Sequence, residues 1–180
     1  MWKALRQLIT PLAYLRISAE GWGKVMIDWL LPGMLAAGVT TIWWNWPSLV
    51  PLGGGSGLLV GVGAVMQILV GFYVAALAAI ATFPTLSLEN DVHRMTLDGE
   101  KIKRRKLLGY LFGYLAVLSM AMLVAMLFRN LPQEAVKLAS PEVARWLKAL
   151  GYFVYQFVLW QMISITLFGI HYLADRIHRS

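Results

Sequence analysis

The chain has 180 residues, of which 59% are hydrophobic and 14% charged, and its formal net charge is +7. A water-soluble domain of this length cannot bury so much apolar surface in one core, so the composition excludes an ordinary globular protein and indicates a membrane protein. The absence of cysteine excludes disulfides and thiolate metal sites. The basic charges lie beside apolar segments, so we interpret them as topology signals and expect no direct nucleic-acid binding.

Four apolar segments are long enough to cross a bilayer as helices. A hydrocarbon layer of roughly 30 Å requires about 20 helical residues. The segments that reach this length are residues 25–46, 58–83, 107–128 and 149–173. The sequence therefore predicts an all-α integral membrane protein with one four-helix transmembrane domain over residues 25–173.

The positive charges lie mainly on one side of these spans. Of the 16 Lys and Arg residues, four precede the first span, six lie in the loop 84–106 and two follow the fourth span, whereas four lie on the opposite side. An excess of Lys and Arg near span ends marks the cytoplasmic side. We therefore expect an inner-membrane protein whose N-terminal segment 1–24, loop 84–106 and tail 174–180 are cytoplasmic and meet anionic lipids.

Two interpretations fit the N-terminal segment. Apolar residues from Trp2 to Leu15 fall near helical spacing among basic residues, which is typical of a helix that lies in the membrane interface. Pro11 would bend or divide such a helix. A loosely ordered basic tail is therefore an equally good interpretation.

Asp28 is the one acid in the four spans. It follows Lys24 by one helical turn and precedes Pro32 by four residues, and the missing N–H of Pro32 frees a carbonyl. Because an ionisable group in a bilayer is costly, it is a candidate functional site. It could handle protons or cations, or it could be an interfacial acid paired with Lys24, depending on its depth.

Two features mark the side opposite the loop 84–106. Trp43, Trp44 and Trp46 end the first span and are typical of an interfacial aromatic belt. The run 140–142 combines a capping serine with a proline and an acid in the first turn of a helix. The sequence therefore predicts a short interfacial helix before the fourth span.

Small residues repeat at helical spacing in the spans, where they would let helices approach closely. They form the pairs Gly57 and Gly61, Gly71 and Ala75, and Gly109 and Gly113. Such pairs can pack helices within one subunit or between subunits. Because four short spans enclose little space, we expect a homo-oligomer.

Three amide side chains lie in the spans, where hydrocarbon cannot satisfy their hydrogen bonds. They are Gln67, Gln156 and Gln161. Gln161, Ser164, Phe168 and His171 follow one another at helical spacings and could line a pore or a substrate path. Hydrogen bonds between helices explain the same residues, and we favour this interpretation.

The loop 84–106 is the most densely charged segment. Its basic cluster runs into the third span and would attract anionic lipid at roughly 1 kcal/mol per charge. With its acids, and a turn at Asp98 and Gly99, it also suits docking of a cytosolic protein. The candidate partner- or lipid-binding residues are Glu89, Asp91, Arg94, Lys101, Lys103, Arg104, Arg105 and Lys106. The alternation of Glu89, Asp91 and His93, without a second cluster, does not predict a metal site.

Motifs of the common catalytic classes are missing from the sequence. It contains no phosphate-binding P-loop, HExxH zinc motif or GxSxG nucleophile elbow. The first and third spans share neither their proline nor their polar positions, which disfavours a carrier built from inverted repeats. We therefore expect a non-enzymatic protein without catalytic residues, cofactor or metal.

In its architecture the chain resembles the small four-span membrane subunit of Kiwa, a bacterial anti-phage system in which a membrane protein assembles with a cytosolic DNA-binding partner. The resemblance rests on size, four spans, cytoplasmic ends and the charged loop from Glu89 to Lys106, and on no specific motif. It implies a homo-oligomer, a tetramer in that family, which senses infection at the envelope and recruits a cytosolic protein. A sensor or scaffold of this kind is the function we expect, and a homo-oligomeric ion channel is the alternative.

Overall fold

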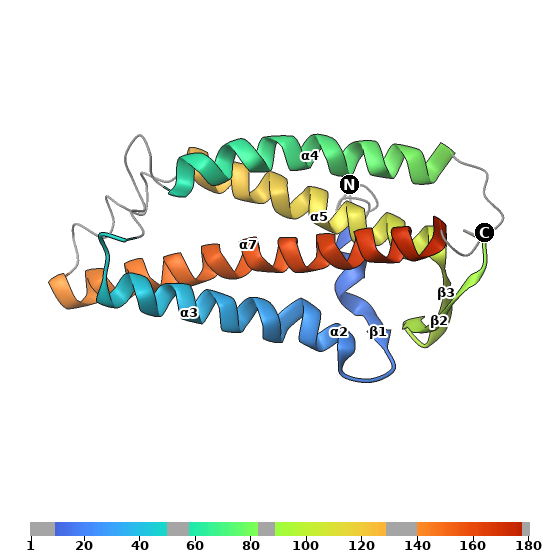
Figure 1. Ribbon diagram of the computed structural model, residues 1–180, viewed down its shortest axis with the longest axis horizontal. Coiled ribbons are helices and arrows are strands. Elements are labelled where there is room, and N and C mark those ends of the chain that lie inside the picture. Colours follow the sequence, from blue (N-terminus) through green and yellow to red (C-terminus); the bar gives the residue numbers. More distant parts are fainter. Residues whose placement is uncertain (1–9, 50–57, 83–88, 129–139, 178–180) are drawn as a thin grey trace, which may run out of the picture.

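A computed structural model of the chain describes residues 10–49, 58–82, 89–128 and 140–177. Helices make up most of this part of the chain (Figure 1). Four of the described helical stretches are long and apolar enough to cross a membrane, namely Gly23–Asn45, Gly61–Thr82, Arg104–Leu127 and Pro141–Tyr172. The prediction of four helices that are long and apolar enough to span a membrane is confirmed.

The first span is not one regular α-helix. It consists of α2 (Gly23–Val25), the π-helical turn η2 (Met26–Leu30) and α3 (Leu31–Asn45). Pro32 lies in the first turn of α3 and lacks the N–H that would bond to the carbonyl of Asp28 in an α-helix. The widened turn therefore contains Asp28 and lies where the regular hydrogen-bond ladder is interrupted.

The other long helices are α4 (Leu58–Thr82), α5 (Arg104–Leu127) and α7 (Pro141–Ile177). α4 packs on α5 and α3 packs on α7, and contacts between α5 and α7 join the two pairs (Figure 1). The span in α5 is 44% buried, whereas the span in α4 is 11% buried. α5 is therefore the central helix, and most of α4 faces outward.

Two glycines outside the predicted pairs permit close contacts between helices. A Cβ on Gly63 of α4 would lie 2.6 Å from Cε of Met126 in α5. A Cβ on Gly169 of α7 would lie 3.1 Å from Leu111 of α5. Because both distances are below ordinary van der Waals contact, the absence of a side chain lets α5 approach both neighbours.

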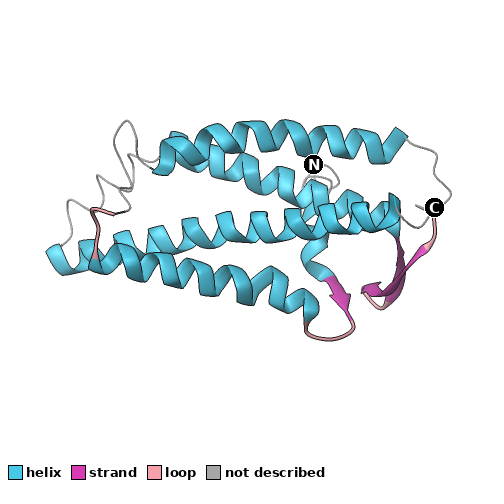
Figure 2. Ribbon diagram, viewed as in Figure 1, coloured by secondary structure: helices cyan, strands magenta, loops and turns pink. Residues whose placement is uncertain are grey.

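A three-stranded antiparallel sheet lies at one end of the bundle, which we call the sheet end (Figure 2). Its order is β1 (Ile17–Ala19), β2 (Asp91–Leu97) and β3 (Glu100–Lys103). Asp98 and Gly99 join β2 to β3 with φ angles of 52° and 88°, which a tight hairpin turn requires. The prediction of an all-α fold is wrong here, because the loop alternates charged residues with Val92 and Ile102, which are buried.

The fourth span begins earlier than the sequence suggested. α7 runs without interruption from Pro141 to Ile177. The predicted short interfacial helix is therefore the first part of α7, because the capping signal at residues 140–142 starts a helix that no later residue breaks. At this end, Trp146 of α7 packs on Trp44 of α3 with ring centroids 4.9 Å apart.

Candidate functional site

Part of the N-terminal segment is folded into the helical bundle. Residues Thr10–Arg16 form the 3-10 helix η1, which packs on α5 and leads directly into β1. Tyr14 is 2% exposed, and its ring stacks on Tyr114 of α5 with centroids 5.2 Å apart. The described part of this segment therefore continues from a 3-10 helix packed on α5 into a strand of the sheet, and residues 1–9 lie outside the described residues.

One glycine of the GxxxG pair in α5 serves this same contact. A Cβ on Gly113 would lie 3.3 Å from Cβ of Pro11 in η1, whereas a Cβ on Gly109 would meet no atom within 4 Å. Gly113 therefore lets the N-terminal segment approach α5 rather than another span. In the described part of the chain, Gly113 is the member of this pair that has a close neighbour.

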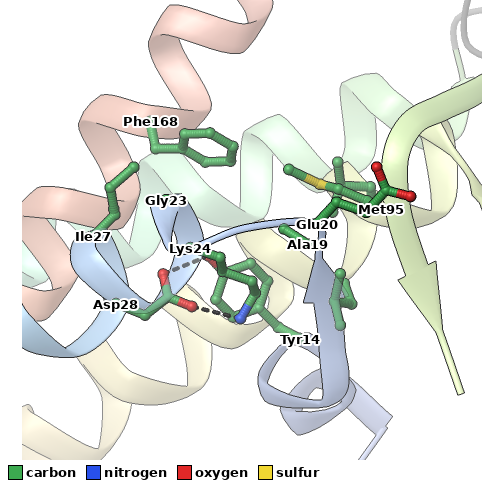
Figure 3. Close-up of a pocket in the computed structure, with 11 residues that line it drawn as sticks. Tyr14, Ala19, Glu20, Gly23, Lys24, Ile27, Asp28, Met95 and Phe168 are labelled. Carbon is green, nitrogen blue, oxygen red and sulfur yellow. Dashed lines mark hydrogen bonds and ion pairs between the residues drawn. The ribbon is translucent and has the colours of Figure 1, made fainter.

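Asp28 is the centre of a buried polar network. Its side chain is 1% exposed, its Oδ1 accepts a hydrogen bond from the Tyr14 hydroxyl at 3.0 Å, and its Oδ2 accepts one from Lys24 Nζ at 2.5 Å. Figure 3 shows the carboxylate with both contacts. The ammonium of Lys24 also lies 4.6 Å from the centre of the Tyr14 ring. Both oxygens are therefore engaged, as a buried carboxylate requires.

The main-chain carbonyl of Asp28 extends the network to α7 and α5. Gln161 Nε2 donates to this carbonyl at 2.9 Å, and Gln161 Oε1 accepts from the Tyr114 hydroxyl at 3.0 Å. Gln161 supplies the donor that Pro32 lacks. The amide of Gln161 thus satisfies a buried carbonyl of η2 and links it, through Tyr114, to α5. This supports the hydrogen-bonding interpretation for Gln161.

Burial, and then the negative charge of Asp28 and its hydrogen bond, raise the pKa of Tyr14 above its ordinary value of 10.0. The raised pKa keeps the phenol protonated throughout the physiological range. The protonated phenol donates its O–H to Oδ1 of Asp28.

A cavity of about 230 Å³ opens beside this network. Its walls come from β1, β2, the start of the first span, α5 and α7, and Figure 3 shows the lining side chains. Tyr14, Glu20, Lys24 and Asp28 are its polar and charged lining residues, and Ile17, Leu107 and Phe168 belong to its apolar walls. The cavity therefore lies between the sheet and the spans.

The charged loop is ordered by ion pairs. Arg16, at the end of η1, bonds to Asp98 in the hairpin turn at 3.0 Å. Glu89 contacts Lys103 and Arg105, each at 3.1 Å. Two of the four acids in the loop therefore hold the sheet end together.

Other predicted loop residues lie on the surface. Asp91, Lys101 and Lys106 are exposed, and Arg104 begins α5 with its N–H bonded to the carbonyl of Asn90 at 3.1 Å. Arg94 lies in β2, and its side chain is outside the described atoms. The sheet end therefore presents lysines at the edge strand β3 and at the first turn of α5.

The small residues predicted to pack α4 have no partner helix in the described chain. Gly61, Gly71 and Ala75 are exposed, and no atom lies within 4 Å of a Cβ placed on either glycine. Gln67 is exposed on the same helix. Gly57 lies outside the described residues. This face of α4 is therefore open to lipid or to another chain.

The remaining polar candidates do not form one continuous path. Gln156 is buried and donates to the Tyr152 hydroxyl on its own helix at 3.0 Å. Ser164 is buried beside Gln161, Phe168 lines the cavity, and His171 is exposed. Among the described residues, no group of three His, Cys, Asp or Glu side chains is placed to hold a metal ion.

Tyr14 and Tyr114 are site residues that the sequence analysis did not select. Each has the sequence context of an ordinary amphipathic residue in a tail or a span. The available signal was a phenol hydroxyl in the middle of the third span, which needs a polar partner in hydrocarbon. The partner itself comes from residue 161, which no local pattern connects to residue 114.

No protein-family model, no curated protein and no solved structure matches this chain.

Proposed function

We propose that this protein is a non-enzymatic sensor or scaffold of the bacterial inner membrane, which assembles with further copies of itself and recruits a cytosolic protein through the sheet end. The observation that carries this proposal is the continuity from Asp28 to the sheet. Tyr14 bonds to Asp28 inside the bundle, and Ile17, three residues later, pairs with Leu97 of β2. A change at the intramembrane network would therefore move a strand of the docking surface.

The charges of the sheet end support its role as a docking surface. Glu89 and Asp98 are engaged within the chain, whereas Lys101 and Lys106 are exposed. Lysines on an edge strand also discourage pairing with other strands, so the surface suits side-chain recognition of an acidic partner more than strand addition. Anionic lipid headgroups would meet the same lysines at the membrane surface.

The exposed face of α4 supports assembly. Gln67 places an amide on the outward side of an apolar helix, where lipid offers it no hydrogen bond. Gly71 and Ala75 leave room for a second helix to approach. A second copy that packs here would give the amide a partner. The resemblance to the Kiwa subunit implies a tetramer and a role in anti-phage defence.

An affinity pull-down from native membranes tests recruitment. Lys101→Glu should abolish capture of a cytosolic protein, because it reverses an exposed charge of the docking surface. Lys148→Glu is the matched control, because Lys148 is also exposed but lies near the opposite end of the bundle. Equal capture by both variants would contradict a docking role for the sheet end.

A homo-oligomeric ion channel is the second candidate, and the exposed amide of Gln67 favours it, since four copies of this side chain could line a lumen. Purified protein in liposomes distinguishes the two. The channel requires ion flux that changes with Gln67→Leu. A scaffold requires no flux from either protein, while Gln67→Leu weakens the association of subunits.

A further inference from the structure

The cavity beside Asp28 has the features of a ligand site. We propose that it binds a single acyl chain whose oxygen-bearing head accepts a hydrogen bond from Lys24. This inference rests on the proposed function in one respect, because it names the class of molecule whose arrival would be sensed.

The size and lining of the cavity suit an acyl chain. At about 230 Å³ it exceeds the roughly 150 Å³ of an apolar cavity that admits benzene, and it is smaller than the roughly 300 Å³ at which sites for drug-sized molecules begin. Ile17, Ile27, Met95, Leu107 and Phe168 give it apolar walls. A slender alkyl segment fits these walls, whereas a bulky polar ligand would leave its hydrogen bonds unmade.

The polar residues that line the cavity determine which head group fits. Both carboxylate oxygens of Asp28 are engaged, one by Tyr14 and one by Lys24. The Lys24 ammonium has three N–H donors, one of which bonds to Asp28, and its side chain retains 14% exposure on the cavity wall. Lys24 therefore has donor capacity left, and Asp28 has little acceptor capacity. Glu20, the other acid of the lining, is exposed and has a partner of its own. A carboxylate, ester or phosphate oxygen is the matching group, whether it belongs to a free fatty acid or to a phospholipid.

The position of the cavity couples occupancy to the sheet. Ile17 and Ala19 belong to β1 and Met95 to β2, while the facing residues belong to the spans. A chain that binds between these two layers stabilises the arrangement in which the sheet is docked on the bundle. Loss of the chain would loosen the docking surface, which gives the proposed sensor a molecular input.

Native mass spectrometry of the delipidated full chain in maltoside detergent tests the site. The probes are dodecanoate and myristoyl lysophosphatidylglycerol, which represent the two sources of the acyl chain. We expect one bound equivalent of at least one probe, and the probe that binds more tightly identifies the source. Dodecyltrimethylammonium, which combines an alkyl chain with a cationic head, should bind at least tenfold more weakly.

Two pairs of variants check where the chain lies. Ala19→Phe fills the cavity from β1, whereas Ser18→Phe places the same ring on the exposed side of the strand. Gly23→Leu fills it from the first span, whereas Gly38→Leu changes a glycine with equally open surroundings outside the cavity. Affinity should fall at least tenfold in each filling variant and change less than twofold in its control.

A variant that lacks the charges of both Lys24 and Asp28 tests the contact with the head group. The double variant Lys24→Gln with Asp28→Asn keeps the network neutral and should bring the affinities of the anionic and cationic probes within twofold of each other. The site is overturned if neither acyl probe binds, or if binding survives in both filling variants. It is also overturned if the double variant still prefers the anionic probes to the cationic probe. Probe binding with no capture of a cytosolic protein would instead overturn the proposed function and leave the site intact.

Discussion

The side-chain amide of Gln161 donates a hydrogen bond at 2.9 Å to the main-chain carbonyl of Asp28, four residues before Pro32. A proline in the first span and a glutamine in the fourth are thus complementary. The proline removes a helical donor from the carbonyl, and the glutamine replaces it from another helix. This relationship fixes the fourth span against the first at the site of the buried ion pair.

Gln161→Leu should destabilise the protein by roughly 1–2 kcal/mol, because it removes the hydrogen bonds of the amide to the Asp28 carbonyl and the Tyr114 hydroxyl. In a Pro32→Ala background the same substitution should cost about half as much, since replacing the proline restores a backbone N–H to the helix. Unfolding of the four proteins in detergent gives this coupling energy. Strictly additive effects would show that the amide does not substitute for the missing donor.

Lys24→Met should destabilise the chain more than the double variant Lys24→Met with Asp28→Asn. The single change leaves a buried carboxylate without its cation, at a cost of roughly 3–5 kcal/mol, whereas the double change leaves a neutral amide. Equilibrium unfolding at neutral pH compares the two proteins. A single variant as stable as the double variant would mean that water reaches Asp28.

Gly113→Leu should displace the N-terminal segment, because even a Cβ at this position lies 3.3 Å from Pro11. Gly109→Leu, one turn away in the same GxxxG pair, meets open space and should be neutral or stabilising by up to about 1 kcal/mol. Limited proteolysis between residues 10 and 20 measures the release of η1. Equal cleavage of the two variants would contradict the packing of Pro11 on Gly113.

Stability should be insensitive to Tyr14 below pH 10.0 and should fall above it. The pKa of Tyr14 is raised from 10.0 in the folded protein, so the unfolded chain releases this proton first as the pH rises. The contribution is therefore present below pH 10.0 and is lost as the pH increases further. Unfolding measured at roughly pH 9 and pH 11 should show a smaller loss for Tyr14→Phe than for the parent, with Tyr110→Phe as the control.

The local sequence specifies the spans and part of the sheet-end chemistry. Hydropathy over about 20 residues suffices for a membrane helix, because lipid requires each span to satisfy its own backbone. The capping run at residues 140–142 located the start of α7, and Asp98 and Gly99 located the hairpin turn. Residue type and the four-residue spacing also indicated that Lys24 and Asp28 form a pair.

The tertiary fold selects which of these residues act together. Tyr14, Asp28, Tyr114 and Gln161 come from η1, η2, α5 and α7, and no periodicity within one segment connects them. The strand β1 exists because Ile17 pairs with Leu97, a residue 80 positions away along the chain. Hydropathy and capping depend on neighbours in sequence, and they were therefore sufficient for the helices. Hydrogen bonds and side-chain packing depend on neighbours in space, so the sheet, the buried network and the cavity arise only in the folded chain.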